Sequence, residues 1–393
     1  MDVIYSCFTT LGAGGLGVDS FELVRGLHAR GHLKRGVFYG NRQTEIPRDR
    51  LRVIRFQPFQ LFSGLPARYY YSLKRIYLDW LTARLIRREG CDVFHGWSTE
   101  SLRSLRAVKA IGGIGFVERP SPYPHVVQRL LDDEYARQGM ARPGATSQGL
   151  LARIEAFHRD RTVAVEEFTL ADRIVLQSEF SYQSFVQMGV PKQKLLMVPR
   201  GVDTARFQPA PATDHPFRVL VVGQLCFRKG VQDVLSAWEI LKLKDAELWL
   251  VGSVHDEVKG LVRRAEDDRS IRVFGHVNEP AALFQQASVF VLPSIVEGSA
   301  KVTYEAMACG LPVVVTPNAG SVARDGQEGF IVPIRDPEAL ADRLLRLYRD
   351  RPLRDAMGQR ARLLMEGHTW DDHRRRMLAA YDEAWRGERD RAH

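Results

Sequence analysis

Residues 289–316 read VFVLPSIVEGSAKVTYEAMACGLPVVVT, and this stretch contains one complete unit of the fold. The run Val289–Leu292 predicts a buried strand, a short loop follows it, and apolar residues then recur at helical spacing. Gly310 ends this helix, and Pro312–Thr316 predicts the next strand. Strand, helix and strand in this order form a parallel βαβ unit.

The same alternation of short apolar runs and helical stretches extends over nearly the whole chain, which predicts parallel sheets covered by helices on both faces. Further strands are predicted at Val3–Phe8, Val37–Tyr39, Asp92–His95, Gly115–Glu118, Arg173–Leu176, Leu195–Val198, Arg218–Gly223, Glu247–Val251 and Arg272–Phe274. A first helix is predicted to begin at Asp19, with Glu22 as its capping partner, and to end at Gly31.

Four prolines between Pro199 and Pro216 interrupt the pattern, as is typical of an interdomain connection. We therefore expect an α/β protein of two doubly wound Rossmann-like domains, residues 1–198 and 217–369, joined by a linker at 199–216. Helical patterns at Pro337–Met365 and Trp370–Trp385 follow, and residues 370–393 are expected to form a closing C-terminal helix.

Composition excludes several classes of protein. The 393 residues include 45% hydrophobic and 26% charged side chains, which excludes a disordered chain, a fibre and a small disulfide scaffold. Neither a secretory signal nor a transmembrane helix is recognisable, and the four cysteines are widely spaced, so we expect a reduced cytoplasmic protein. The net charge of +9 reflects either an arginine-rich genome or attraction to anionic lipid or nucleic acid.

A glycine loop, GAGGLG at Gly12–Gly17, follows the first strand and matches the G-x-G-x-x-G pattern of dinucleotide-binding proteins. That pattern also needs an acidic residue after the second strand, where Gly40 and Asn41 stand instead, so a nicotinamide cofactor is not expected. Two interpretations remain: backbone amides that face an anionic ligand at a helix N-terminus, or a tight turn without a ligand.

The loop Glu297–Gly298 leaves backbone amides of Ser299–Lys301 at the start of a helix, where they form a candidate phosphate site. Glu305 lies about four residues further on, ~6 Å along the helix axis, roughly the step from a pyrophosphate to a ribose. Glu297 would then reach whatever is bonded beyond the phosphates. The alternative is a solvated Glu297 and a surface ion pair between Lys301 and Glu305.

Two glutamates separated by seven residues, followed by Ala-Met-Ala and Gly310, resemble the E-x7-E motif of the retaining family 4 glycosyltransferases with the GT-B fold. The stretch VLVVGQLCFRKG at Val219–Gly230 is similar to the strand, glycine and basic pair of the same family. The resemblance implies that Arg228 and Lys229 bind the diphosphate of a nucleotide sugar, and that Glu305 binds the ribose.

The resemblance also implies a role for Glu297 at the transferred sugar, and a C-terminal helix that starts at Trp370 and crosses back to the first domain. It assigns further donor contacts to these loop residues: Gly14, Gly15, Gly223, His276, Val277, Ser299, Ala300, Lys301 and Val302.

The chain departs from the common family pattern in three ways. Ser299-Ala300 replaces an aromatic-glycine pair, and Lys301 replaces an apolar residue, so Lys301 either contacts phosphate or pairs with Glu305. A histidine is usual after the N-domain strand that here ends at Glu118, which leaves Glu118, His125 and His95 as alternative candidates near the reacting sugar. No aspartate pair stands at a strand end, so neither a metal nor any cofactor other than the nucleotide sugar is expected.

The resemblance implies transfer of a sugar, with retention, from a nucleoside diphosphate to a glycan or lipid-linked acceptor in cell-surface polysaccharide or glycolipid synthesis. The alternatives are a GT-B nucleotide-sugar epimerase, a non-catalytic module that binds nucleotide sugars or a membrane surface, and a nucleic-acid binder. The absence of a recognisable nucleic-acid motif argues against the last of these.

The sequence contains few residues that indicate which acceptor is bound. Aromatic and basic residues between Leu61 and Arg88 predict a helix with two possible positions. The helix either lies against an anionic membrane or packs on the first domain. The first alternative would make the protein peripheral to the inner face of the cell membrane. Residues 139–149 are expected to form a loop beside the acceptor.

Overall fold

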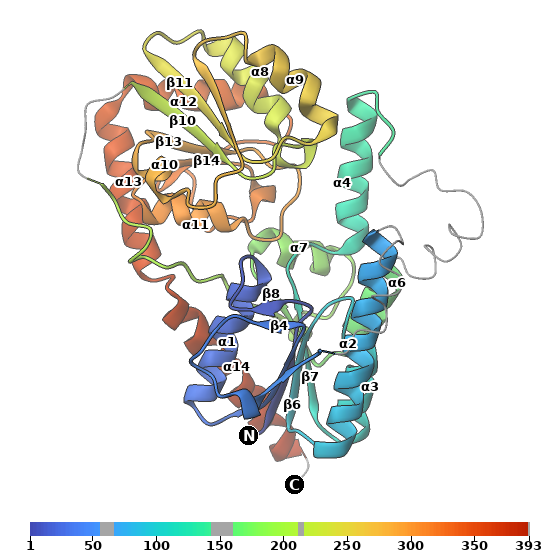
Figure 1. Cartoon of the computed structure of the whole chain (residues 1–393). Helices are drawn as coiled ribbons and strands as arrows, with labels where there is room; N and C mark the ends of the chain where they lie inside the picture. Colours follow the sequence, from blue (N-terminus) through green and yellow to red (C-terminus); the bar gives the residue numbers. More distant parts are fainter. Residues whose placement is uncertain (56–66, 143–159, 211–215, 392–393) are drawn as a thin grey trace.

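The computed structural model describes residues 1–55, 67–142, 160–210 and 216–391. Residues 61–66 of the predicted acceptor-side helix and 143–149 of the predicted loop lie outside this described part. The described chain forms two α/β domains stacked one above the other (Figure 1).

The first domain is built on a parallel sheet in the order β5-β3-β1-β6-β7-β8-β9. Its strands are β1 (Val3–Ser6), β3 (Leu33–Phe38), β5 (Leu51–Val53), β6 (Val93–Trp97), β7 (Ile114–Arg119), β8 (Arg173–Leu176) and β9 (Leu195–Met197). A small separate ladder pairs β2 (Thr10–Leu11) with β4 (Gly40–Asn41). The helices are α1 (Leu16–Ala29), α2 (Ala67–Glu89), α3 (Leu102–Ala110), α4 (Pro124–Arg137), α6 (Asp160–Leu170) and α7 (Glu179–Gln187), with short 3-10 turns η1 (Arg48–Arg50) and η3 (Lys192–Lys194).

The second domain has a parallel sheet in the order β12-β11-β10-β13-β14-β15. Its strands are β10 (Phe217–Val222), β11 (Ala246–Val251), β12 (Ile271–Gly275), β13 (Val289–Leu292), β14 (Val313–Val315) and β15 (Gly329–Ile331). The helices are α8 (Val231–Leu241), α9 (Lys259–Ala265), α10 (Ala281–Gln285), α11 (Lys301–Ala308), α12 (Pro337–Arg349) and α13 (Arg351–Glu366), with turns η4 (Phe227–Lys229), η5 (Asp256–Val258) and η6 (Pro317–Ala319).

Both sheets reverse strand order next to their first strand, between β1 and β6 and between β10 and β13. In open parallel sheets, ligands bind outside the carboxyl ends of the strands at such a switch point. The loops after β10 and β13 therefore meet where a ligand is expected, and these loops carry the basic pair and Glu297.

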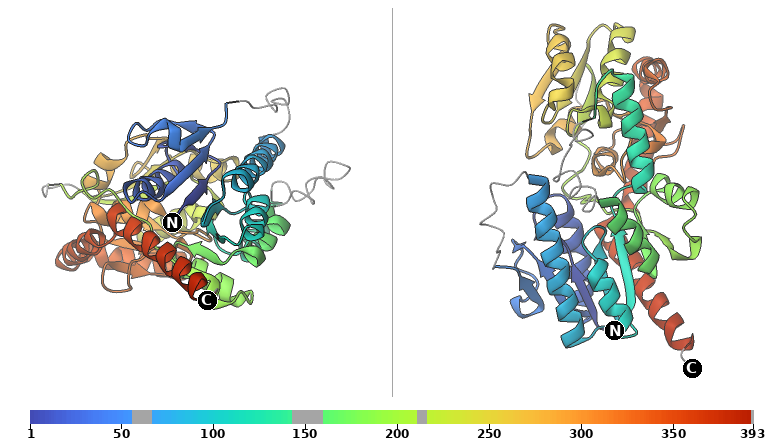
Figure 2. Two further views of the ribbon diagram at one scale, coloured as in Figure 1. Left: turned by 90° about the horizontal axis from the view of Figure 1, so that it is seen from below. Right: turned by 90° about the vertical axis from the view of Figure 1, so that its right-hand side faces the viewer.

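The last helix, α14 (Trp370–Arg391), returns to the first domain and lies beside α1 (Figure 1; Figure 2). Its buried side chains Met377, Leu378 and Tyr381 belong to the same apolar cluster as Val3 and Tyr5 of β1. The predicted return of the C-terminal helix is confirmed.

The predicted start of the first helix is wrong. Helix α1 begins at Leu16 after Gly15, and no side chain caps it. Asp19 and Glu22 lie inside the helix, where Asp19 accepts a hydrogen bond from Arg200 Nη2 at 2.7 Å and Glu22 pairs with Arg374 of α14. The two acidic residues therefore bind distant arginines instead of capping the helix.

Candidate active site

Arg228 and Lys229 lie in the turn η4 that follows the buried strand β10. The turn ends at Gly230, whose φ of 73° favours glycine, and a Cβ there would lie 2.2 Å from the carbonyl oxygen of Pro293. The amide of Ile295 donates to the carbonyl of Arg228 at 2.9 Å. These contacts hold the basic pair against the loop that follows β13.

Glu297 in that loop contacts both cations. Lys229 Nζ lies 2.9 Å from Glu297 Oε1, and the Arg228 guanidinium contacts the same oxygen. Only 11% of the Lys229 side chain and 13% of the Glu297 side chain are exposed. Burial, and then repulsion from Arg228, lower the pKa of Lys229 to about 7. The structure thus brings together residues 69 positions apart in sequence.

This cluster lies where the two domains meet. The hydroxyls of Ser178 and Ser181 in the first domain donate to the carbonyl of Gly298, next to Glu297. A Cβ on Gly298 would lie 1.9 Å from the carbonyl oxygen of Pro120, also in the first domain. The loop that carries Glu297, the partner of the basic pair, is therefore packed against the first domain.

Glu305 lies one turn into α11 and is 4% exposed. Lys301, the first residue of α11, places its Nζ 2.9 Å from Glu305 Oε1. Of the two predicted roles for Lys301, the structure shows the ion pair with Glu305. A ribose that binds Glu305 would have to share the carboxylate with this ammonium group.

The predicted phosphate site at the start of α11 is smaller than expected. The Ala300 amide donates to the carbonyl of Ala319 at 3.1 Å, so the prediction that it is free to bind a ligand is wrong. The amides of Ser299, Lys301 and Val302 have no hydrogen-bond acceptor among the described residues. They remain the candidate donors to a phosphate.

The remaining predicted donor residues lie at different distances from this cluster. Gly223 is adjacent to it, because a Cβ built there would lie 3.8 Å from Lys229 Nζ. Gly14 and Gly15 lie in an exposed turn that leads into α1, and Gly15 has a φ of 66°. His276 and Val277 follow β12 at the same edge of the second sheet, with His276 Nε2 3.1 Å from Asn278 Oδ1. Contacts of these residues with a donor remain predictions.

Glu118 and His95 form a buried network in the first domain. Glu118 is 2% exposed, lies 3.4 Å from His95 Nε2, and accepts a hydrogen bond from Gln177 at 2.8 Å. Burial raises the pKa of Glu118, but the contacts with His95 and Gln177 outweigh it and hold the pKa below its usual value. His95 Nδ1 lies 2.5 Å from the hydroxyl of Tyr381 in α14. In this structure both residues therefore bind protein groups, and they connect α14 to the first sheet.

His125 lies in the first turn of α4, is exposed, and stacks on Tyr123 with ring centroids 5.7 Å apart. No hydrogen bond or ion pair joins Glu118, His95 or His125 to Glu297 among the described residues. A role for any of them at a reacting sugar remains a prediction.

Sequence reasoning missed the contact that α4 makes with the second domain. Glu134 of α4 is 1% exposed, and it accepts hydrogen bonds from Gln232 at 2.9 Å and from Arg335 at 2.6 Å. Tyr135 packs edge-on against Phe227, the residue before Arg228. Figure 1 shows α4 extending from the first domain to the side of the second. No local pattern predicts this contact, because it depends on how the domains pack.

The described residues lack two kinds of feature. They contain no cluster of three or more His, Cys, Asp or Glu residues that could hold a metal ion. None of the helices in the described ranges is long and apolar enough to span a membrane.

Comparison with known proteins identifies the family. The family model described as "Glycosyltransferase Family 4" matches residues 13–206, and the model described as "Glycosyl transferases group 1" matches residues 216–350. The first match covers most of the first domain, and the second covers the sheet that carries Arg228 and Glu297.

Individual relatives match over shorter stretches. The chain is 32% identical over 174 residues to the putative colanic acid biosynthesis glycosyltransferase WcaL of Escherichia coli, covering 40% of this chain and 43% of that protein. It is 31% identical over 221 residues to the D-inositol 3-phosphate glycosyltransferase of Paenarthrobacter aurescens, covering 51% of this chain and 54% of that protein. The matched part thus spans about half the length of these curated relatives.

A solved structure matches over almost the full length. The Anabaena protein Alr3699/HepE, in complex with UDP, superposes with a TM-score of 0.68 at 16% identity, and the match covers 98% of this chain and 100% of that one. This likeness supports the shared fold. With family models that match both domains, and with the basic pair, Glu297 and Glu305 in place, the chain belongs to the family 4 (group 1) glycosyltransferases with the GT-B fold.

Proposed function

We propose that the protein is a retaining glycosyltransferase that moves a sugar from a nucleoside diphosphate to a glycan or lipid-linked acceptor in the synthesis of cell-surface polysaccharide. The contact of Arg228 and Lys229 with Glu297 between the two domains carries this proposal. Two relatives point in the same direction, since one is named for colanic acid biosynthesis and another for capsular polysaccharide biosynthesis.

In this proposal, Arg228 and Lys229 exchange the Glu297 carboxylate for the diphosphate of the donor. A guanidinium binds two phosphate oxygens in parallel, and the buried ammonium adds a compact second charge. Both groups then stabilise the negative charge that develops on the phosphate as the sugar–phosphate bond breaks. Glu297, once released, accepts hydrogen bonds from hydroxyl groups of the transferred sugar, and Glu305 accepts them from the ribose. The basic pair takes the place of a metal ion in this scheme.

The test is release of nucleoside diphosphate from a panel of nucleotide sugars, with and without a glycan or lipid extract as acceptor. We expect release that depends on the acceptor. We expect Lys229→Ala to lower the rate by about 100-fold, because the variant lacks the buried positive charge that stabilises the leaving phosphate group. The matched control is Lys259→Ala, which removes a lysine that pairs with Asp256 on the surface of the same domain.

An unchanged rate in the folded Lys229→Ala protein would refute the site assignment. Interconversion of nucleotide sugars without any acceptor would instead identify an epimerase. The anomeric configuration of the product, read by NMR, tests retention, and activity in the presence of EDTA tests independence from metal.

A further inference from the structure

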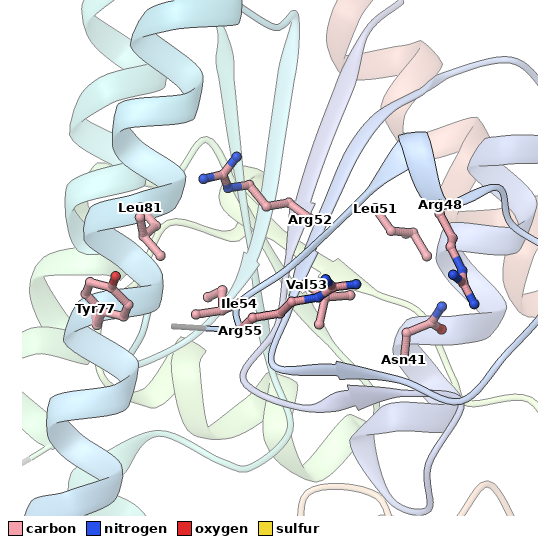
Figure 3. A pocket seen from close by; sticks show the side chains of 9 residues that line it. All are labelled: Asn41, Arg48, Leu51, Arg52, Val53, Ile54, Arg55, Tyr77 and Leu81. Atoms are coloured by element: carbon pink, nitrogen blue, oxygen red, sulfur yellow. The ribbon is translucent and has the colours of Figure 1, made fainter. Parts of the chain in front are cut away.

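A cavity lies in the first domain. It has a volume of about 630 Å³ and lies between the edge strand β5, with η1 and β4, on one side and α2 on the other (Figure 3). Its lining is made up of Asn41, Arg48, Leu51, Arg52, Val53, Ile54, Arg55, Tyr77 and Leu81. None of these residues lies on an element that carries Arg228, Lys229, Glu297 or Glu305.

Three arginines give this cavity a strong positive charge. Arg48, Arg52 and Arg55 form no ion pair or hydrogen bond with other side chains in the described part of the chain, and the lining contains no Asp or Glu. The adjacent acidic residue in sequence, Asp49, lies 3.8 Å from Arg50 and is not part of the lining. Figure 3 shows Arg48 beside Asn41 on one side, Arg52 extending toward α2, and Arg55 between them.

The rest of the lining favours a ligand with both an anionic group and an apolar or ring-shaped part. Leu51 and Ile54 are buried, and together with Val53 and Leu81 they supply the apolar part of the lining. The Asn41 side-chain oxygen accepts a hydrogen bond from the Gln43 amide at 3.2 Å, which leaves its NH2 group available as a donor. A volume of this size is within the range of small-molecule sites.

We propose that this cavity is a binding site for a ligand that carries a phosphate or diphosphate group. Three arginines without carboxylate partners in the described lining favour a ligand with more than one negative charge over a ligand with a single carboxylate. Guanidinium groups bind phosphate oxygens bidentately, and the apolar residues of the lining accommodate the body of the ligand. The proposal concerns a site separate from the donor site and does not rest on the function proposed above.

The test uses inorganic pyrophosphate as the probe. Because pyrophosphate would also bind Arg228 and Lys229, all proteins carry Arg228→Ala and Lys229→Ala. In this background, one variant also replaces Arg48, Arg52 and Arg55 by alanine. The matched control replaces Arg263, Arg264 and Arg269 instead, three exposed arginines at and just after α9 that make no ion pair within the described residues.

Both triple variants lose the same net charge, so a difference between them reports the site and not general electrostatics. We expect calorimetry to show saturable binding of pyrophosphate that weakens at least tenfold in the cavity variant and changes less than twofold in the control. Replacing the same three residues by lysine should recover part of the affinity, because charge is kept while bidentate contacts are lost.

Two further measurements complete the test. The first measures chemical modification by phenylglyoxal in the protein without the triple substitutions. Pyrophosphate should slow the modification of the three cavity arginines relative to that of the three control arginines. This result does not depend on whether the triple variants fold.

Flotation with phosphatidylcholine vesicles, with and without phosphatidylglycerol, distinguishes the sources of the phosphate. Flotation lost only in the cavity variant indicates a lipid headgroup, and equal flotation of both variants alongside the pyrophosphate difference indicates a soluble ligand. The proposal is overturned if pyrophosphate affinity, arginine protection and flotation all fail to separate the cavity arginines from the control arginines.

Discussion

Glu297→Gln should have opposite effects on nucleotide binding and on sugar transfer. Glu297 contacts both Arg228 and Lys229, so a diphosphate must displace its carboxylate before it can bind them. Glutamine has nearly the same shape but lacks the charge. The substitution therefore removes an internal competitor of the diphosphate while leaving the two cations in place.

The size of the effect follows from the exposure of each contact. The Lys229 contact is 2.9 Å long between side chains that are 11% and 13% exposed, so its net contribution is about 1.5 kcal/mol. The Arg228 side chain is 34% exposed, and solvent screening reduces its contact to about 0.5 kcal/mol. A total of about 2 kcal/mol corresponds to about 30-fold in affinity. Because the glutamine oxygen still accepts a weaker hydrogen bond, we expect affinity to rise by about 5- to 30-fold.

Calorimetric titration with UDP, GDP and ADP measures this effect for whichever nucleotide binds. Sugar transfer by the same variant should fall at least tenfold, since the sugar loses a charged hydrogen-bond acceptor. The matched control is Glu247→Gln, because Glu247 also binds two arginines, Arg218 at 3.1 Å and Arg272 at 2.7 Å, but at the amino end of the second sheet. Weaker or unchanged nucleotide binding by Glu297→Gln would show that the carboxylate does not compete with the diphosphate, and the reasoning would fail.

Three further substitutions test other parts of the structure. Arg335→Ala leaves the buried Glu134 carboxylate without its cation, and we expect urea denaturation to show a loss of about 2–3 kcal/mol in the free energy of unfolding. Burial raises the pKa of Glu100 from 4.5 to about 8. Between these pH values the folded state binds more protons than the unfolded state, so the free energy of unfolding falls as pH rises. Glu100→Gln should therefore reduce the difference in melting temperature between pH 5.5 and 8.5. Gly298→Ala places a Cβ against the carbonyl of Pro120, so we expect the domains to separate locally, with a lower melting temperature and at least threefold weaker nucleotide binding.

Each of these substitutions has a control in the same chain. Arg343→Ala removes a half-exposed arginine 3.6 Å from Asp342 and should change stability by less than about 0.5 kcal/mol. Glu166→Gln, at an exposed pair with Arg106, should leave the pH dependence unchanged. Gly260→Ala, whose Cβ approaches only the end of the Arg264 side chain, should leave nucleotide binding unchanged. A variant that behaves like its control contradicts the corresponding contact.

Local patterns predicted the central part of each sheet well. The strands at Arg173–Leu176 and Val289–Leu292 have the predicted bounds, because buried parallel strands are continuous apolar runs. The short edge strands Leu51–Val53 and Gly329–Ile331 were not predicted, since each has only three residues and little apolar signal. The predicted start of α1 was wrong because Asp19 and Glu22 resemble the capping residues of a helix start. In the structure they lie inside the helix and bind Arg200 and Arg374, which no local pattern indicates.

The contact between the basic pair and Glu297 could be anticipated. The basic pair follows β10 and Glu297 follows β13, and these strands are neighbours in a parallel sheet, so the loops after them lie at the same edge. The burial of Glu118 with His95 and Tyr381 could not, because Tyr381 is 286 residues from His95 in sequence. The same limit applies to Glu134 and to the arginine-lined cavity, which depend on packing between elements that no local spacing encodes.

The return of α14 to the first domain has a consequence for how the protein is made. Met377, Leu378 and Tyr381 complete an apolar core whose other members include Val3 and Tyr5, so residues from near both ends of the chain share one interior. During synthesis on a ribosome, the residues of α14 emerge only after those of the second domain, so this core is completed after the second domain has been translated. The nascent chain therefore carries an incomplete first core while the second domain is translated.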